Sequence, residues 1–142
     1  MTEVRPARDP SEVDAALALR YEVFCVEQGV SLEDERDGRD DAALHLVVAD
    51  DGEVVGTCRL VAEGSEVKLG RMAVASSHRG RRLAAALLAE ADARARELGG
   101  RRIVLAAQLT AQAVYERAGY APYGEVFLDA DIEHVMMGKA LE

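Results

Sequence analysis

The chain has 142 residues, a length that suits one domain built around one hydrophobic core. Hydrophobic residues make up 49% and charged residues 30%, which is typical of globular proteins. No apolar run approaches the roughly 18 residues of a membrane span. The net charge of −9 argues against nucleic acid as a main partner, because phosphate binding needs a basic face. The opening residues, MTEVRPARDP, lack the apolar core of a signal peptide, so we expect a cytoplasmic domain over residues 1–142, away from membranes.

Cysteine and histidine are too few and too scattered to indicate a disulfide framework or a metal site. Cys25 and Cys58 are best interpreted as small buried hydrophobic residues. His45, His78 and His134 lie far apart, with no spacing typical of zinc ligands. We therefore predict no bound metal.

The first half of the chain predicts a strand, a helix and three antiparallel strands. The helix begins at Asp9-Pro10-Ser11-Glu12, where the aspartate caps, the proline fits the first position and the glutamate stands three residues after the cap. Apolar residues then recur at helical spacing as far as Phe24. The acidic residues 33–41 predict a solvated, mobile loop, long enough to be a candidate functional segment. Turns at Asp51-Gly52 and Gly64-Ser65 separate the later strands. The strands are expected at residues 4–7, 44–49, 54–61 and 67–74.

The second half alternates helices and strands. Residues 83–98 carry an apolar stripe that ends at Gly99-Gly100, as a capped helix does. Residues 103–107 are apolar without alternation, which indicates a strand buried on both faces. Thr110 is expected to cap a short helix ending at Gly119, and two strands follow in residues 120–141. This order predicts a mixed α/β sheet with helices on its faces.

The segment before the long helix reverses the overall charge of the chain. In His78-Arg79-Gly80-Arg81-Arg82, every residue except the glycine can be cationic, although the protein has a net charge of −9. A helix N-terminus offers unpaired N–H groups and a partial positive charge, which together bind phosphate. Gly80 allows the backbone to approach an anion closely. Cations at a helix start cost roughly 0.3–1 kcal/mol without a ligand, so the pattern favours a polyanionic ligand over simple surface decoration.

This run resembles the phosphate-binding signature of the GNAT superfamily of acyltransferases, which reads Arg or Gln, two residues, Gly, one residue, then Gly or Ala. Arg79 and Ala84 match its ends, and Arg82 replaces the central glycine. We expect Arg82 to have an ordinary helical φ. Residues 20–28, and a patch from Ala107 to His134, resemble the ElaA-like branch of the superfamily. The resemblance implies a GNAT-like, mostly antiparallel sheet with a central pair of splayed parallel strands.

For the acyl donor, the resemblance implies acetyl-CoA as co-substrate and no metal. Backbone groups of β-strand residues would face the pantetheine arm and the thioester, and the turn would hold the pyrophosphate. Gln108 would reach the pantetheine. The implied donor-binding residues are Met72, Ala73 and Val74 on the strand, and Arg79, Gly80, Arg81, Arg82, Leu83 and Ala84 at the helix start.

For the reaction, the resemblance implies direct attack of an amine on the thioester. A free alkyl amine has a pKa of about 10.4, so a base must first remove a proton. The N–H of Val74 is a candidate donor to the oxyanion. Tyr115 occupies the position of the acid that protonates the thiolate.

The base and the acceptor-binding residues are open choices. Glu27, His134 and His45 are the candidate bases, with Glu35 and Asp41 behind them. Gln28, His45 and Arg71 are predicted to border the acceptor, with Arg71 paired to Glu27 or to another acid. The acceptor is expected to be a small-molecule or peptide amine, and the acidic balance indicates a cationic one.

Two other functions remain open. The patch from Arg20 to Phe24 also resembles acyl-homoserine lactone synthases, which use an acyl carrier and S-adenosylmethionine. A non-catalytic domain that senses acyl-CoA is the second alternative, because Arg82 departs from the signature. Either a monomer or a homodimer fits the sequence.

Overall fold

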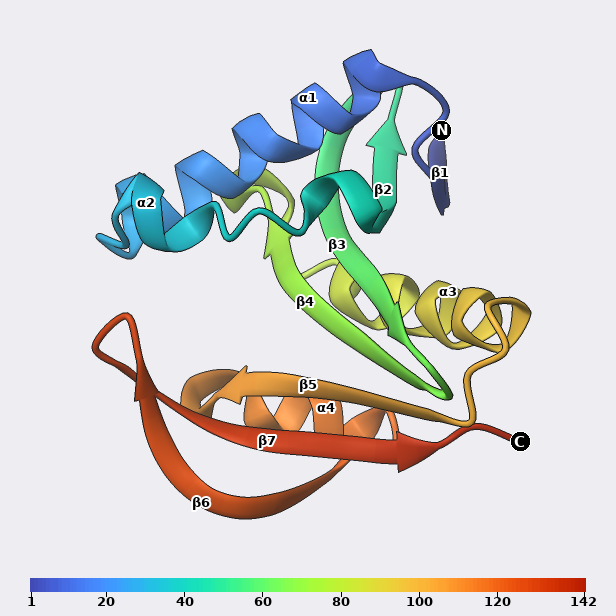
Figure 1. Cartoon of the computed structure of the whole chain (residues 1–142). Coiled ribbons are helices and arrows are strands. Elements are labelled where there is room, and N and C mark those ends of the chain that lie inside the picture. The colour runs from blue at the N-terminus through green and yellow to red at the C-terminus, as the bar shows by residue number, and fades with distance from the viewer.

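The protein folds into a seven-stranded mixed sheet with helices packed against it (Figure 1). The structure is a computed structural model that describes all 142 residues. The sheet order is β1-β2-β3-β4-β5-β7-β6. All neighbouring strands are antiparallel except β4 and β5, which are parallel. The strands are β1 (Thr2–Pro6), β2 (Leu44–Asp50), β3 (Glu53–Glu63), β4 (Glu66–Val74), β5 (Arg102–Gln108), β6 (Ala121–Asp129) and β7 (Ile132–Ala140).

The parallel pair determines where a ligand can enter the sheet. β4 and β5 are paired only from Glu66 and Arg102 to Lys68 and Val104. Beyond that point the two strands diverge, and Figure 1 shows the sheet opening into a V between them. The predicted mostly antiparallel sheet with a splayed parallel pair is confirmed.

The helices cover the two faces of the sheet. Figure 1 shows α1 (Pro10–Arg20) on one side of β2–β4 and α3 (Leu83–Glu97) on the other. α3 buries Leu87, Leu88, Ala91 and Ala95 against the sheet, as its apolar stripe predicted. α4 (Gln112–Arg117) lies behind β5 and β7, and no helix is long and apolar enough to cross a membrane.

The start of α1 follows the predicted cap. The Asp9 carboxylate accepts a 2.9 Å hydrogen bond from the N–H of Glu12, and Pro10 is the first helical residue. The helical run continues beyond α1 as a π-helix, η1 (Tyr21–Glu27), which changes the register of the side chains that follow.

Two predictions of local structure are wrong. Thr110 does not cap α4, because a 3₁₀ turn, η4 (Leu109–Ala111), lies between β5 and the helix and makes Ala111 the N-cap. The acidic residues 33–41 are mostly exposed, but they do not form a loop without structure of its own. They contain α2 (Leu32–Glu35) and the start of the 3₁₀ turn η2 (Asp40–Ala42), and Glu35 is buried with only 2% of its surface exposed.

Candidate active site

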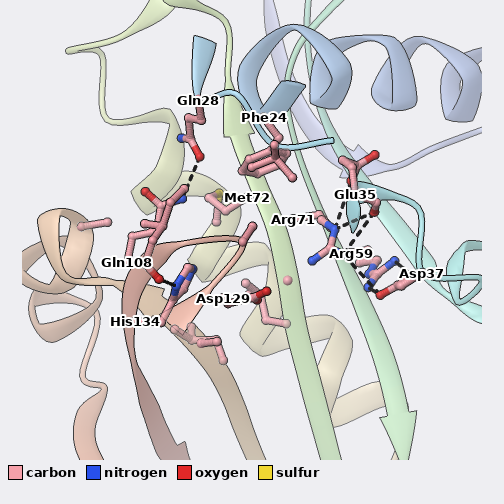
Figure 2. A pocket seen from close by; sticks show the side chains of 18 of the residues that line it. Phe24, Gln28, Glu35, Asp37, Arg59, Arg71, Met72, Gln108, Asp129 and His134 are labelled. Atoms are coloured by element: carbon pink, nitrogen blue, oxygen red, sulfur yellow. Dashed lines mark hydrogen bonds and ion pairs between the residues drawn. The ribbon is translucent and has the colours of Figure 1, made fainter. Parts of the chain in front are cut away.

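A cavity of about 420 Å³ lies where β4 and β5 part. One wall comes from η1 and the acidic segment, the floor from β4 and β5, and the other wall from α4 and the tip of the β6–β7 hairpin. Figure 2 shows side chains from all these parts of the chain converging on one space. Of the residues predicted to form the site, those that line it are Gln28, Glu35, Arg71, Met72, Ala84, Gln108, Tyr115 and His134.

Arg71 reaches this cavity because β4 bulges at that point. Thr57 of β3 pairs with Ala73, but Arg59 pairs with Gly70, so β4 contains one extra residue between these pairs. Arg71 has a φ of +55°, in the left-handed region that non-glycine residues rarely adopt. Bulges of this kind redirect a side chain, and here Arg71 turns toward the acidic segment.

Six charged side chains form a closed cycle of ion pairs beside the cavity, which we call the charge ring. Three carboxylates of the acidic segment alternate with three arginines from α1, β3 and β4. Their members in order around the ring are Arg20, Glu35, Arg71, Asp37, Arg59 and Asp40.

Glu35 is the most buried carboxylate of the charge ring. Its Oε2 lies 2.6 Å from Nη2 of Arg20 and 3.0 Å from Nε of Arg71, and its Oε1 lies 3.1 Å from Nε of Arg36. The backbone oxygen of Glu35 also accepts hydrogen bonds from Nε and Nη2 of Arg71, at 3.2 and 3.1 Å. These contacts fix the guanidinium of Arg71 from one side.

The other half of the ring surrounds Arg59. Its Nη1 lies 2.8 Å from Oδ1 of Asp37 and 3.0 Å from Oδ1 of Asp40. The hydrogen bond from Arg59 holds the pKa of Asp37 well below its usual range, although burial opposes this. Burial also opposes the ionisation of Asp40, but hydrogen bonds from Arg20 and Arg59 outweigh it and lower the pKa of Asp40. Both carboxylates are therefore ionised at neutral pH.

The opposite wall carries the aromatic candidates. Tyr115 is 8% exposed, and its ring meets Tyr120 edge to face at 6.1 Å. Burial raises the pKa of Tyr115 to about 12, so its hydroxyl keeps its proton at neutral pH. His134 stacks on Phe127 at 5.8 Å. Its Nδ1 lies 2.7 Å from the carbonyl oxygen of Ile132, which can only accept, so Nδ1 carries the proton and Nε2 is free.

Two amides close one end of the cavity. The Nε2 of Gln108 donates a 2.9 Å hydrogen bond to Oε1 of Gln28. Gln108 ends β5 and Gln28 follows η1, so this bond connects the two walls (Figure 2).

The predicted phosphate turn meets the cavity at Ala84, the one residue of residues 79–84 that lines it. No side chain caps the first turn of α3, and Arg81 and Arg82 are exposed at its start. These features suit a polyanion. His78, by contrast, turns away from the helix start, and its Nε2 lies 2.9 Å from Oδ2 of Asp50.

The conformation of Arg82 corrects the expectation of a helical φ. Arg82 is the N-cap of α3 and has φ +60° and ψ +29°, which is left-handed. Glycine adopts that region without a steric cost, which accounts for the glycine in the usual signature at this position.

Glu27 and His45 do not line the cavity. Glu27 pairs with Arg79, and the Nε of Arg79 donates to the carbonyl of Val74 at 3.1 Å. His45 is buried, and its Nε2 lies 2.9 Å from the backbone oxygen of Asp40. It therefore contacts the backbone of a charge-ring residue and not the cavity. Arg71 pairs with Glu35 and Asp37 and not with Glu27.

Sequence reasoning missed the charge ring. The signals were present, because Arg20 interrupts an apolar helical stripe and Arg59 interrupts an apolar strand. A buried arginine needs a carboxylate partner, and residues 33–41 carry six carboxylates, three of which the ring uses.

Comparisons with known proteins agree with this geometry. The family model for the acetyltransferase (GNAT) domain matches residues 7–141. A Bacillus subtilis protein named as an uncharacterized N-acetyltransferase, YjcF, is 33% identical over 134 residues, which cover 94% of this chain and 96% of YjcF. An acyl-CoA N-acyltransferase from Pseudomonas aeruginosa superposes with a TM-score of 0.86 at 32% identity, covering 99% of both chains.

Escherichia coli ElaA superposes with a TM-score of 0.85 at 26% identity, covering 98% of both chains. The predicted resemblance to the superfamily and to ElaA is therefore confirmed. The family match spans nearly the whole chain, the splayed strands and the cavity between them. This chain belongs to the GNAT family of N-acetyltransferases.

Proposed function

We propose that the protein transfers an acetyl group from acetyl-CoA to a primary amine by direct attack in the cleft between β4 and β5. The observation that carries this proposal is the position of the cavity. It lies at the point where the parallel strands part, beside an uncapped helix start that carries free arginines. A long thioester with a polyanionic end fits such a cleft. Its thioester end needs the cavity, and its polyanionic end needs the helix start with its arginines.

The donor binds along β4 in this proposal. Past Lys68 the edge of β4 that faces β5 has no strand partner, so its backbone groups are available to the pantetheine amides. The N–H groups at the start of α3 hold the pyrophosphate, with Arg81 and Arg82 nearby. The N–H of Val74 is our candidate donor to the oxyanion.

The chemical step forms one C–N bond and breaks one C–S bond. The amine attacks the thioester carbonyl, and its proton passes to the free Nε2 of His134, directly or through water. Tyr115 protonates the departing thiolate, a role that its place in the cavity and its protonated hydroxyl at neutral pH support. His134 is our preferred base, because Glu27 is paired with Arg79 outside the cavity lining.

The test is thiol release from acetyl-CoA in the presence of a panel of primary amines, with mass spectrometry of the products. We expect release that depends on the amine and a product heavier by one acetyl group. Tight binding of acetyl-CoA with no amine-dependent release would instead indicate a sensor. Acylation of S-adenosylmethionine from an acyl carrier would indicate a homoserine-lactone type of synthase.

A further inference from the structure

We infer that Arg71 is the binding group for a carboxylate on the acceptor, so that the acceptor is an amino acid or a related amine with a nearby carboxylate. This inference rests on the proposed function, because it names the class of amine that the cavity selects. It follows from how Arg71 is held, from which of its nitrogens remain free, and from the charges around it.

Arg71 is held rigidly by groups that leave one nitrogen unused. Its Nε and Nη2 contact the carboxylate and backbone oxygen of Glu35, and Nη2 lies 3.4 Å from Oδ2 of Asp37. Its Nη1 takes no part in these bonds. Figure 2 shows the guanidinium between the acidic segment and the cavity, with Glu35 and Asp37 behind it. A guanidinium fixed in this way offers Nη1 to a ligand at a small entropic cost.

The side chains around Arg71 favour an anion. Within the charge ring three arginines meet three carboxylates, so their charges balance, and Arg71 keeps one nitrogen free for a further anion. Lys68 also lines the cavity and forms no ion pair, and it lies on the same strand. An ammonium group placed beside these cations would be repelled, whereas a carboxylate would be attracted.

The opposite wall supplies the complementary charge. Asp129 lines the cavity at the end of β6, on the wall that also carries His134 (Figure 2). Its carboxylate takes part in no ion pair, in contrast to Glu35 and Asp37 of the ring. An acceptor with a carboxylate toward Arg71 and an ammonium toward Asp129 matches both walls. This arrangement distinguishes an amino acid from the polycationic acceptor that the overall acidity of the chain suggested.

The test compares free amino acids with their carboxamides as acceptors, because each pair differs only in the carboxylate. The readout is kcat/KM for thiol release from saturating acetyl-CoA. With the wild-type protein we expect at least a tenfold preference for the acid over the amide of the favoured amino acid. Arg71→Gln should raise KM for the acid and reduce that preference to within about twofold. Arg71→Lys should keep part of it.

Arg36→Gln is the matched control, because Arg36 contacts the same carboxylate of Glu35 from outside the cavity. It should leave the preference for the acid intact. Equal rates with acids and amides in the wild type, or an equal loss with both substrates in Arg71→Gln, would overturn the inference while leaving the proposed function in place. Failure of every amine in the panel to release thiol would count against the proposed function itself.

Binding of the products gives a second measurement that does not depend on turnover. Calorimetry in the presence of coenzyme A compares N-acetyl amino acids with N-acetyl amino acid amides. If the acids bind more tightly than the amides, and Arg71→Gln abolishes this difference in affinity, the carboxylate subsite is supported. Absence of any carboxylate-dependent binding across the panel overturns it.

Discussion

Glu27 and Arg79, which lie 52 residues apart in the chain, form a bidentate ion pair between the end of η1 and the turn before α3. Nη2 of Arg79 lies 3.0 Å from Oε1 of Glu27, and Nη1 lies 2.9 Å from Oε2. Arg79 is also the first residue of the GNAT phosphate signature. The pair therefore occupies a cation that the donor would use, and we propose that Glu27 competes with the donor for Arg79 instead of acting as a base.

Glu27→Gln tests which role is correct. If Glu27 only competes with the pyrophosphate for Arg79, its loss should tighten acetyl-CoA binding by up to about fivefold, since exposed ion pairs contribute little. The turnover number should stay nearly constant. If Glu27 is the base, kcat should instead fall by about a hundredfold or more. Calorimetry and steady-state rates separate these outcomes. Glu22→Gln, at an exposed position of the same π-helix, is the control.

Tyr115→Phe removes the proposed acid and retains the ring that packs against Tyr120. We expect kcat to fall by about 10²- to 10⁴-fold, with the affinity for acetyl-CoA nearly unchanged. The measurement is the pH profile of kcat together with a direct binding titration. The matched variant is Tyr120→Phe, because the Tyr120 hydroxyl is buried without a hydrogen-bond partner. Its removal should leave activity intact, and an unaltered kcat in Tyr115→Phe would reject the acid role.

The sequence predicted the strands and α3 well, because their signals are local. Apolar residues at helical spacing placed α3, and strand-like segments between turn signals placed β2, β3 and β4 to within about two residues. The charge ring could not be read in this way. Its ion pairs join residues 15 to 36 positions apart, and only the folded chain shows which arginine meets which carboxylate. Composition alone made the same acidic residues resemble a solvated loop.

The ring predicts that the protein loses stability in acid. The pKa of Asp37 and that of Asp40 are lowered in the folded state relative to an unfolded value of about 3.9. Such carboxylates stabilise the fold above the unfolded pKa, and this contribution is lost as the pH falls through the folded pKa. The free energy of unfolding should therefore fall below about pH 4. In urea titrations between pH 5 and 2.5, Asp37→Asn should have a flatter pH dependence than the wild type. Parallel curves for the two proteins would contradict this assignment.

Glu35→Gln should destabilise the fold strongly, because it leaves Arg20 buried without its main counter-charge. Breaking one partner of a buried ion pair costs about 3–5 kcal/mol. Urea unfolding measures the loss, and the control is Arg36→Gln, whose arginine is 43% exposed on the outer side of the same carboxylate. We expect the control to change the free energy of unfolding by less than about 1 kcal/mol. Similar losses of unfolding free energy in both variants would show that the buried ion pairs of Glu35 stabilise the fold no more than its exposed pair with Arg36.

At Arg82, the effect of the left-handed backbone conformation can be measured separately from the effect of the side-chain charge. In the left-handed region a side chain costs roughly 1–2 kcal/mol that glycine avoids, so Arg82→Gly should be more stable than Arg82→Ala by about 1 kcal/mol. Both variants lack the guanidinium, so the difference between them reports φ alone. Both should also bind acetyl-CoA more weakly than the wild type, with a shallower salt dependence, because one cation near the proposed pyrophosphate site is gone. Equal stability of the two variants would mean that the turn relaxes out of the left-handed region. An unchanged salt dependence of binding would mean that Arg82 does not face the phosphates, and the helix N–H groups with Arg79 and Arg81 would then hold them without it.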